Sequence, residues 1–230
     1  MALKPSERDN FVYLTVALLL VLFLIAIAEQ FTATMGGRFI KGMLLVALTG
    51  AMWSVRHHGG AFKSGLLVLG GFLFLELASY WLDLTELRLL QLTLLFLYFG
   101  SMAWLAVKQV LFMTGPIDAN RLLGAVAVYL LIGLQWAVVY LAILEIDPTA
   151  FNGTEPGSWG QSFHELVYFS FVSLTTLGYG DISPASPVTR FLVYLEAIIG
   201  QLYLAIMVAG LVGVGISSRT SVTTRSGSHE

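Results

Sequence analysis

Long apolar segments separated by short polar stretches set the pattern of this chain. A membrane-spanning helix needs about 20 mostly apolar residues, because the hydrocarbon core of a bilayer is about 30 Å thick. A shorter amphipathic segment, residues 162–174, precedes the last long segment. The pattern predicts an all-α integral membrane protein with one re-entrant helix and six transmembrane helices, at residues 11–28, 39–55, 65–81, 89–113, 122–146 and 188–216.

The composition agrees with this prediction and excludes several other classes of protein. The chain of 230 residues is 57% hydrophobic and 11% charged, whereas soluble domains average about 25% charged residues. A net charge of −2 argues against a nucleic-acid partner, and the absence of cysteine excludes a disulfide framework. No small-residue cleavage site follows the first apolar segment, so we expect a retained helix rather than a signal peptide.

The distribution of basic residues predicts the orientation in the membrane. Six spans place both termini on one side of the membrane, and we expect that side to be the cytoplasm. The protein is expected to be a multi-pass protein of the plasma or inner membrane. Residues 1–10 form a cytoplasmic tail, and residues 218–230, rich in Ser and Thr, form a disordered one. This places Lys4, Arg8, Arg56, Lys63, Lys108, Arg121, Arg219 and Arg225 inside, against Arg38, Lys41, Arg88 and Arg190 outside.

Between the last two spans lies a polar, glycine-punctuated stretch, TTLGYGD at residues 175–181. Irregular backbone at membrane depth is tolerated only where protein buries it or a cavity hydrates it. Glycines at alternate positions, Gly178 and Gly180, permit left-handed backbone angles. Alternating conformations would turn successive carbonyls to the same side, and such a column of oxygens suits a hard cation that sheds its water.

This stretch and its context resemble the selectivity filter of potassium channels, in which TVGYG loops supply carbonyl ligands. Leu177 stands where valine or isoleucine is usual, a mild departure because that position offers its carbonyl. The resemblance implies passive, potassium-selective conduction, with potassium ions in the filter and no organic cofactor. It assigns ion binding to Thr175, Thr176, Leu177, Gly178, Tyr179 and Gly180, with K⁺ held by the carbonyls of Thr176, Leu177, Gly178 and Tyr179 and by the Thr176 hydroxyl.

A closed ring around an ion needs four such loops, and one chain holds one loop. The resemblance therefore implies a homotetramer, in which the partners are three further copies of the chain and membrane lipid. Tyr179 favours potassium selectivity, because sodium-permeant relatives often replace this tyrosine.

The segment before the filter is expected to be a pore helix. Ser162 to Glu165 reads as a capping box that starts this helix, and its carboxyl end would favour a cation at the pore centre. An HExxH metal site is absent, because Tyr168 replaces the second histidine. Filter support is assigned to Asp181, Tyr168 and Val172. Tyr168 is expected to hydrogen-bond Asp181, or else to pack as an ordinary aromatic residue, and Val172 replaces a glutamate found in some bacterial relatives.

Gating residues are predicted in the last span. Gly200 lies 20 residues after Gly180, a spacing that resembles the gating-hinge glycine of potassium channels. Val212 or Ile216 would form an apolar ring that closes the inner mouth by dewetting. The alternative is that the glycines of this span only allow close helix packing in lipid. Glu76 and Glu196 are intramembrane carboxylates for which the sequence suggests no assignment.

The six-span layout resembles voltage-gated potassium channels, but the voltage sensor is missing. The fourth span has no basic residue between Arg88 and Lys108, whereas a sensor carries some 3–4 charges per subunit. Residues 11–113 are therefore read as a voltage-sensor-like domain without gating arginines, and residues 119–217 as the pore domain. We expect weak or no voltage dependence.

Two further readings stay open. The chain is not expected to be an enzyme, since no nucleophile–base set or metal-ligand spacing occurs in it. A channel-like but non-conducting subunit or scaffold that modulates a partner is the alternative function. Residues 147–160 are expected to form an outer turret, in which Asn152 begins a glycosylation-acceptor triplet that is also common by chance.

Overall fold

The computed structural model describes residues 10–35, 67–68, 70–72, 74–75, 85–112, 119–154 and 159–226. Over these ranges the chain is mostly helical. The elements are α1 (Asn10–Met35), α4 (Thr85–Phe112), α5 (Ala119–Ile146), β1 (Phe151–Asn152), α6 (Trp159–Leu174), β2 (Ser183–Pro184) and α7 (Pro187–Ser226).

Three helices in the described part are long and apolar enough to cross a membrane. Their spans are Glu86–Val110, Asn120–Ile146 and Pro187–Met207, and α1 adds a shorter apolar stretch, Phe11–Ile27. These agree with four of the segments expected from the hydropathy pattern. The segment 39–55 and most of 65–81, including Glu76, lie outside the described residues, so six spans remain a prediction.

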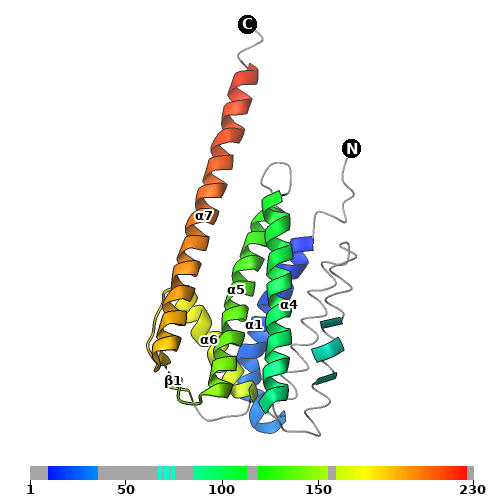
Figure 1. The fold of residues 1–230 in the computed structure, drawn as a ribbon. Helices are drawn as coiled ribbons and strands as arrows, with labels where there is room; N and C mark the ends of the chain where they lie inside the picture. Colours follow the sequence, from blue (N-terminus) through cyan, green and yellow to red (C-terminus); the bar gives the residue numbers. More distant parts are fainter. Residues whose placement is uncertain are drawn as a thin grey trace.

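Helix α5 lies at the centre of the bundle and contacts α1, α4, α6 and α7 (Figure 1). Its buried face carries small residues, which let neighbouring helices approach closely where no hydrophobic effect drives their association. Gly133 is one of these small residues. A Cβ at this position would lie only 2.7 Å from the ring of Phe171 on α6. The aliphatic and aromatic residues Leu131, Leu134, Tyr140 and Leu141 are fully buried beside it.

Polar contacts fix both ends of the antiparallel α4–α5 hairpin. At one end Arg88 Nε lies 3.1 Å from Glu145 Oε2. At the other, Arg121 Nε donates to the Val110 carbonyl at 2.6 Å. Because α5 runs from Arg121 to Glu145, the ion pair lies at the end of the bundle that leads directly into the turret.

Two boundaries differ from those expected. The pore helix α6 begins at Trp159 rather than Ser162, so Ser162 and Glu165 lie inside the helix and do not form its capping box. Helix α7 continues to Ser226, through most of the tail expected to be disordered from residue 218. Neither proline nor glycine occurs between Gly215 and Gly227, and elongating an established helix is far easier than starting one.

The capping box of this fold lies instead at the start of α7. The Ser186 N–H donates to Thr189 Oγ1 at 3.1 Å, and the Thr189 N–H donates to Ser186 Oγ at 3.2 Å. Pro187 occupies the first helical position, where its missing N–H costs nothing. The sequence SPVT thus sets the start of α7 a few residues after the TTLGYGD stretch.

Candidate functional site

The TTLGYGD stretch leaves the carboxyl end of α6 as an irregular, exposed backbone. Residues 175–181 are all exposed in the single chain. The backbone φ is positive at every second residue: 59° at Thr176, 59° at Gly178 and 80° at Gly180. This alternation of handedness is the conformation that turns successive carbonyls to one side.

Thr176 is the unusual member of this set. Positive φ is rare for a β-branched residue and is costly unless the surroundings impose it. The surroundings here are hydrogen bonds to the last turn of α6. The Thr176 N–H donates to the Ser173 carbonyl at 3.0 Å, and the Leu177 N–H donates to Val172 O at 2.9 Å.

These hydrogen bonds use the N–H groups of the loop and not its carbonyls. The Gly178 N–H adds a contact of 3.3 Å to the same Val172 carbonyl, so three successive N–H groups point back at the helix end. Among the described residues, no hydrogen bond is accepted by the carbonyls of Thr176, Leu177, Gly178 and Tyr179. The loop therefore presents oxygens without internal partners, as an ion site made of carbonyls requires.

The outer end of the loop is held through Asp181. The Tyr168 hydroxyl donates to Asp181 Oδ2 at 2.6 Å, and the Ile182 N–H donates to Oδ1 at 3.0 Å. The bond from Tyr168 lowers the pKa of Asp181, and the same bond raises the pKa of Tyr168 to about 12. Val172 is buried; its backbone carbonyl makes the contacts with the loop that are described above.

The segment after α5, expected to form the turret, makes a second contact with the Asp181 end of the loop. Sequence reasoning missed this contact. Strand β1 pairs antiparallel with β2, with Phe151 opposite Pro184 and Asn152 opposite Ser183. The next residue, Gly153, has a φ of 83°, and a Cβ there would lie 2.0 Å from the Asp181 carbonyl oxygen. The Asn-Gly dipeptide, a turn signal, was the clue in the sequence, but only the fold places it against the filter.

A cluster of aromatic rings joins α5, α6 and β1. Tyr140 of α5, Phe151 of β1 and Phe169 of α6 contact one another with ring centroids 5.4 to 5.5 Å apart. Glu196 of α7 reaches the same region, because its carboxyl group lies within hydrogen-bond distance of both Tyr140 and Ser170. Sequence reasoning left Glu196 unassigned, because these partners lie 56 and 26 residues away along the chain.

Gly200 lies where α7 crosses the end of the pore helix. A Cβ at this position would lie 2.4 Å from the carbonyl oxygen of Leu174, the last residue of α6. The next residue, Gln201, has its Nε2 atom 3.5 Å from Thr176 Oγ1. The side chains of Val212 and Ile216 lie outside the described residues, so the closing ring remains a prediction.

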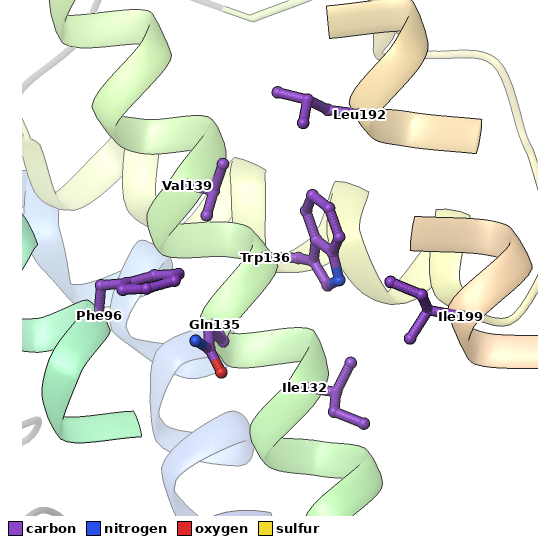
Figure 2. Close-up of a pocket in the computed structure, with 7 residues that line it drawn as sticks. All are labelled: Phe96, Ile132, Gln135, Trp136, Val139, Leu192 and Ile199. Atoms are coloured by element: carbon purple, nitrogen blue, oxygen red, sulfur yellow. The ribbon is translucent and has the colours of Figure 1, made fainter. Parts of the chain in front are cut away.

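A separate cavity of about 380 Å³ opens on the flank of the bundle, between α4, α5 and α7 (Figure 2). The polar groups of its lining are the Gln135 amide and the Trp136 indole N–H, so the cavity offers no acid, base or nucleophile. The remaining lining residues are Phe96, Ile132, Val139, Leu192 and Ile199. Within the described residues, no group of His, Cys, Asp and Glu is arranged to hold a metal ion either.

Two apolar helices, α5 and α7, flank a short helix and an exposed loop whose carbonyls have no partner among the described residues, and an ion-channel pore is built from parts of this kind. Comparison with known proteins agrees with this class. Residues 126–216 match the model of the family described as "Ion channel". The match begins within α5 and includes the pore helix, the loop and Gly200.

The chain is also similar to the inward rectifier potassium channel Kirbac3.1 of Paramagnetospirillum magnetotacticum, at 36% identity over 78 residues. The aligned part covers 34% of this chain and 24% of that relative. No solved structure matches the chain at a comparable level of significance. The two matches support a potassium-channel type of membrane protein, and they point to a channel rather than an enzyme.

Proposed function

We propose that this protein is a potassium-selective channel that conducts K⁺ passively through a pore lined by Thr176, Leu177, Gly178 and Tyr179. The observation that carries the proposal is the positive φ at alternate residues of an exposed loop whose carbonyls have no partner among the described residues. The similarity to a potassium channel over 78 residues adds support. Thr175 and Gly180 complete the ion-binding stretch, and K⁺ is its only cofactor.

The proposed assembly is a homotetramer. Only 11% of the span Pro187–Met207 is buried within the chain, against 50% of Asn120–Ile146. Leu177 and Tyr179 are also exposed, and buried apolar partners for them would have to come from other copies. The uncovered face of α7 carries apolar residues at helical spacing: Val188, Phe191, Tyr194, Ile198, Leu202 and Ile206.

The proposed orientation places the filter end outside and both termini in the cytoplasm. Asp181 lies at the same end of the bundle as the Arg88–Glu145 ion pair, because α5 leads from Glu145 into the turret that covers Asp181. Lys108 and Arg121 lie at the opposite end. Residues 11–113 then form a voltage-sensor-like domain without gating arginines, and residues 119–217 form the pore domain of a plasma-membrane or inner-membrane protein.

The decisive experiment is cation flux into liposomes that contain the purified protein. The native chain is expected to admit K⁺ and Rb⁺ and to exclude Na⁺. Gly178→Ala places a Cβ at a φ of 59°, a conformation that costs an L-residue roughly 1 to 2 kcal/mol, and we expect it to lower flux about tenfold or more.

D-alanine at position 178, introduced by semisynthesis, is the matched control. It carries the same Cβ but prefers positive φ, and a Cβ at Gly178 meets nothing within 4 Å in the chain. We expect it to retain flux. Equal flux in the L-alanine and native proteins would show that ions take another path. A native protein without flux would favour a non-conducting subunit that modulates a partner.

A further inference from the structure

Glu196 is a carboxyl group buried where three helices of the pore meet. Its side chain is fully buried, as are those of Tyr140 on α5 and Ser170 on α6. Glu196 Oε2 lies 2.5 Å from the Tyr140 hydroxyl, and Oε1 lies 2.5 Å from Ser170 Oγ. Ser170 Oγ also lies 2.7 Å from the carbonyl oxygen of Gly133 on α5.

Counting protons over these contacts shows the state of the carboxyl group. Three hydrogen bonds require three protons, and the Tyr140 and Ser170 hydroxyls supply one each. The Gly133 carbonyl supplies none. If Glu196 were ionised, Ser170 would face two acceptors with a single proton. A proton on Oε1 completes the chain: Tyr140 donates to Glu196, Glu196 donates to Ser170, and Ser170 donates to Gly133.

The described residues around Glu196 offer no positive charge to hold a carboxylate. Helix α5 contributes Tyr140 and Tyr129, and the Tyr129 hydroxyl donates to the Leu174 carbonyl. Helix α6 contributes Ser170. On α7 the nearest cation in sequence is Arg190, whose Nε donates to the Pro184 carbonyl at the surface. No ion pair involves Glu196 among the described residues, and an unpaired buried carboxylate is strongly disfavoured.

We propose that Glu196 is held as a neutral carboxylic acid and is a positioning residue for the pore helix. Its hydrogen bonds join α7 to α5 directly at Tyr140, and through Ser170 of α6 at Gly133. Ser170 lies one turn before α6 ends at the proposed filter. The consequence for the filter rests on the proposed function. The neutral state of Glu196 does not rest on the proposed function, because it follows from the hydrogen-bond contacts alone.

The protonation state is tested by infrared spectroscopy of the full-length protein in liposomes at neutral pH. The native protein is expected to show a carboxylic-acid carbonyl band that disappears in Glu196→Gln. Glu145→Gln is the control: Glu145 pairs with Arg88, so its removal should leave the band in place. Ser170→Ala should shift the band to higher frequency, because the acid loses its acceptor. A band that is absent, or that Ser170→Ala leaves unshifted, overturns the proposal.

The positioning role is tested by the K⁺ over Na⁺ flux ratio of the same samples. The amide of Glu196→Gln donates to Ser170 and accepts from Tyr140, so its ratio should stay within about twofold of the native value. Glu196→Leu offers no hydrogen bond and should reduce the ratio about tenfold. A glutamine variant as impaired as the leucine variant would mean that the ionised form is needed. If the native protein conducts nothing, the proposed function fails while the infrared result still decides the state of Glu196.

Discussion

Asp181 and Tyr168 show how a single contact sets the pH range of the outer filter. The pKa of Asp181 is lowered and that of Tyr168 is raised to about 12. The contribution of a carboxylate with a lowered pKa is present above its ordinary pKa and is lost as pH falls through the lowered one. On the alkaline side, the bond persists until Tyr168 ionises. The contact should therefore be unaffected by pH over the physiological range.

Tyr168→Phe removes this hydrogen bond and leaves Asp181 with the Ile182 N–H alone. The pKa of Asp181 then returns toward its ordinary value, so acid should reduce flux at a higher pH than in the native channel. The measurement is Rb⁺ flux against external pH. Tyr13→Phe is the control, since Tyr13 is 68% exposed on α1. Identical acid profiles for Tyr168→Phe and the native protein would contradict the role of this bond.

Thr176 is a residue whose strain the neighbouring helix imposes. Its positive φ follows from N–H groups that close the last turn of α6, not from a preference of threonine. The same closure leaves its carbonyl without a partner among the described residues. At this scale, the strain at Thr176 and the ion binding proposed for its carbonyl have one structural cause.

Among the elements, the segment expected to form the turret is paired through β1 with β2, directly after the proposed filter. The Ala185 N–H donates to the Ala150 carbonyl at 2.9 Å, so the β1–β2 pairing continues toward α7. Phe151 anchors the strand in the aromatic cluster beside α5 and α6. The turret thus connects the outer filter to the helices that support it.

Gly153→Ala should displace the outer filter. The left-handed conformation alone costs roughly 1 to 2 kcal/mol, and a Cβ 2.0 Å from the Asp181 oxygen adds a steric clash with backbone. We expect a lower melting temperature and a reduced K⁺ over Na⁺ flux ratio. Asn152→Ala, which removes only a 3.4 Å contact to Ser183, should change neither by much. Equal behaviour of the two variants would argue against the turret as a filter support.

Gly200 lies at the crossing of α6 and α7, where it can serve either close helix packing or bending of α7. Gly200→Ala places a methyl group 2.4 Å from the Leu174 carbonyl, and overpacking of this kind typically costs about 1 to 3 kcal/mol. We expect reduced thermal stability of the assembly. At Gly210 a Cβ meets nothing within 4 Å in the chain, so Gly210→Ala should gain up to about 1 kcal/mol of helix stability. Unchanged stability with an altered open probability in Gly200→Ala would favour the hinge.

At the scale of the whole molecule, the position of the charges on α4 bears on how the proposed channel responds to voltage. Helix α4 contains Arg88, which pairs with Glu145, and Lys108, which lies over the Trp104 ring at 5.0 Å. Both charges lie near the ends of the span Glu86–Val110, so in the proposed channel we expect neither to cross the membrane field. Helix α4 packs directly on α5 (Figure 1), so we expect it to support the proposed pore without sensing voltage.

Planar-bilayer recording in symmetrical K⁺, without blocking ions, should give a nearly flat conductance–voltage relation. Each elementary charge that crosses the membrane contributes about 2.3 kcal/mol per 100 mV, and α4 supplies none between Arg88 and Lys108. The apparent gating charge should fall well below the 3–4 per subunit of a true sensor. A steep sigmoidal relation would place moving charge elsewhere in the chain.

The sequence by itself determined the membrane class, the positions of α1, α4, α5 and α7, and the irregular stretch at residues 175–181, whose role as a selectivity filter stays a prediction. These follow from hydropathy over about 20 residues and from a local order of residues, both of which act through near neighbours along the chain. It also led to the Tyr168–Asp181 contact, because the two residues flank one short loop. It did not give the start of α6 or the end of α7, where helix propagation outweighed the local signals.

Only the tertiary structure decided what joins the filter to the rest of the molecule. Gly153 meets Asp181, Gly200 meets Leu174, and Glu196 meets both Tyr140 and Ser170. Each pair is separated by 26 residues or more, so no periodicity or motif encodes it. The physical reason is that a close backbone approach or a buried proton depends on how helices cross, and crossing is decided by packing in three dimensions.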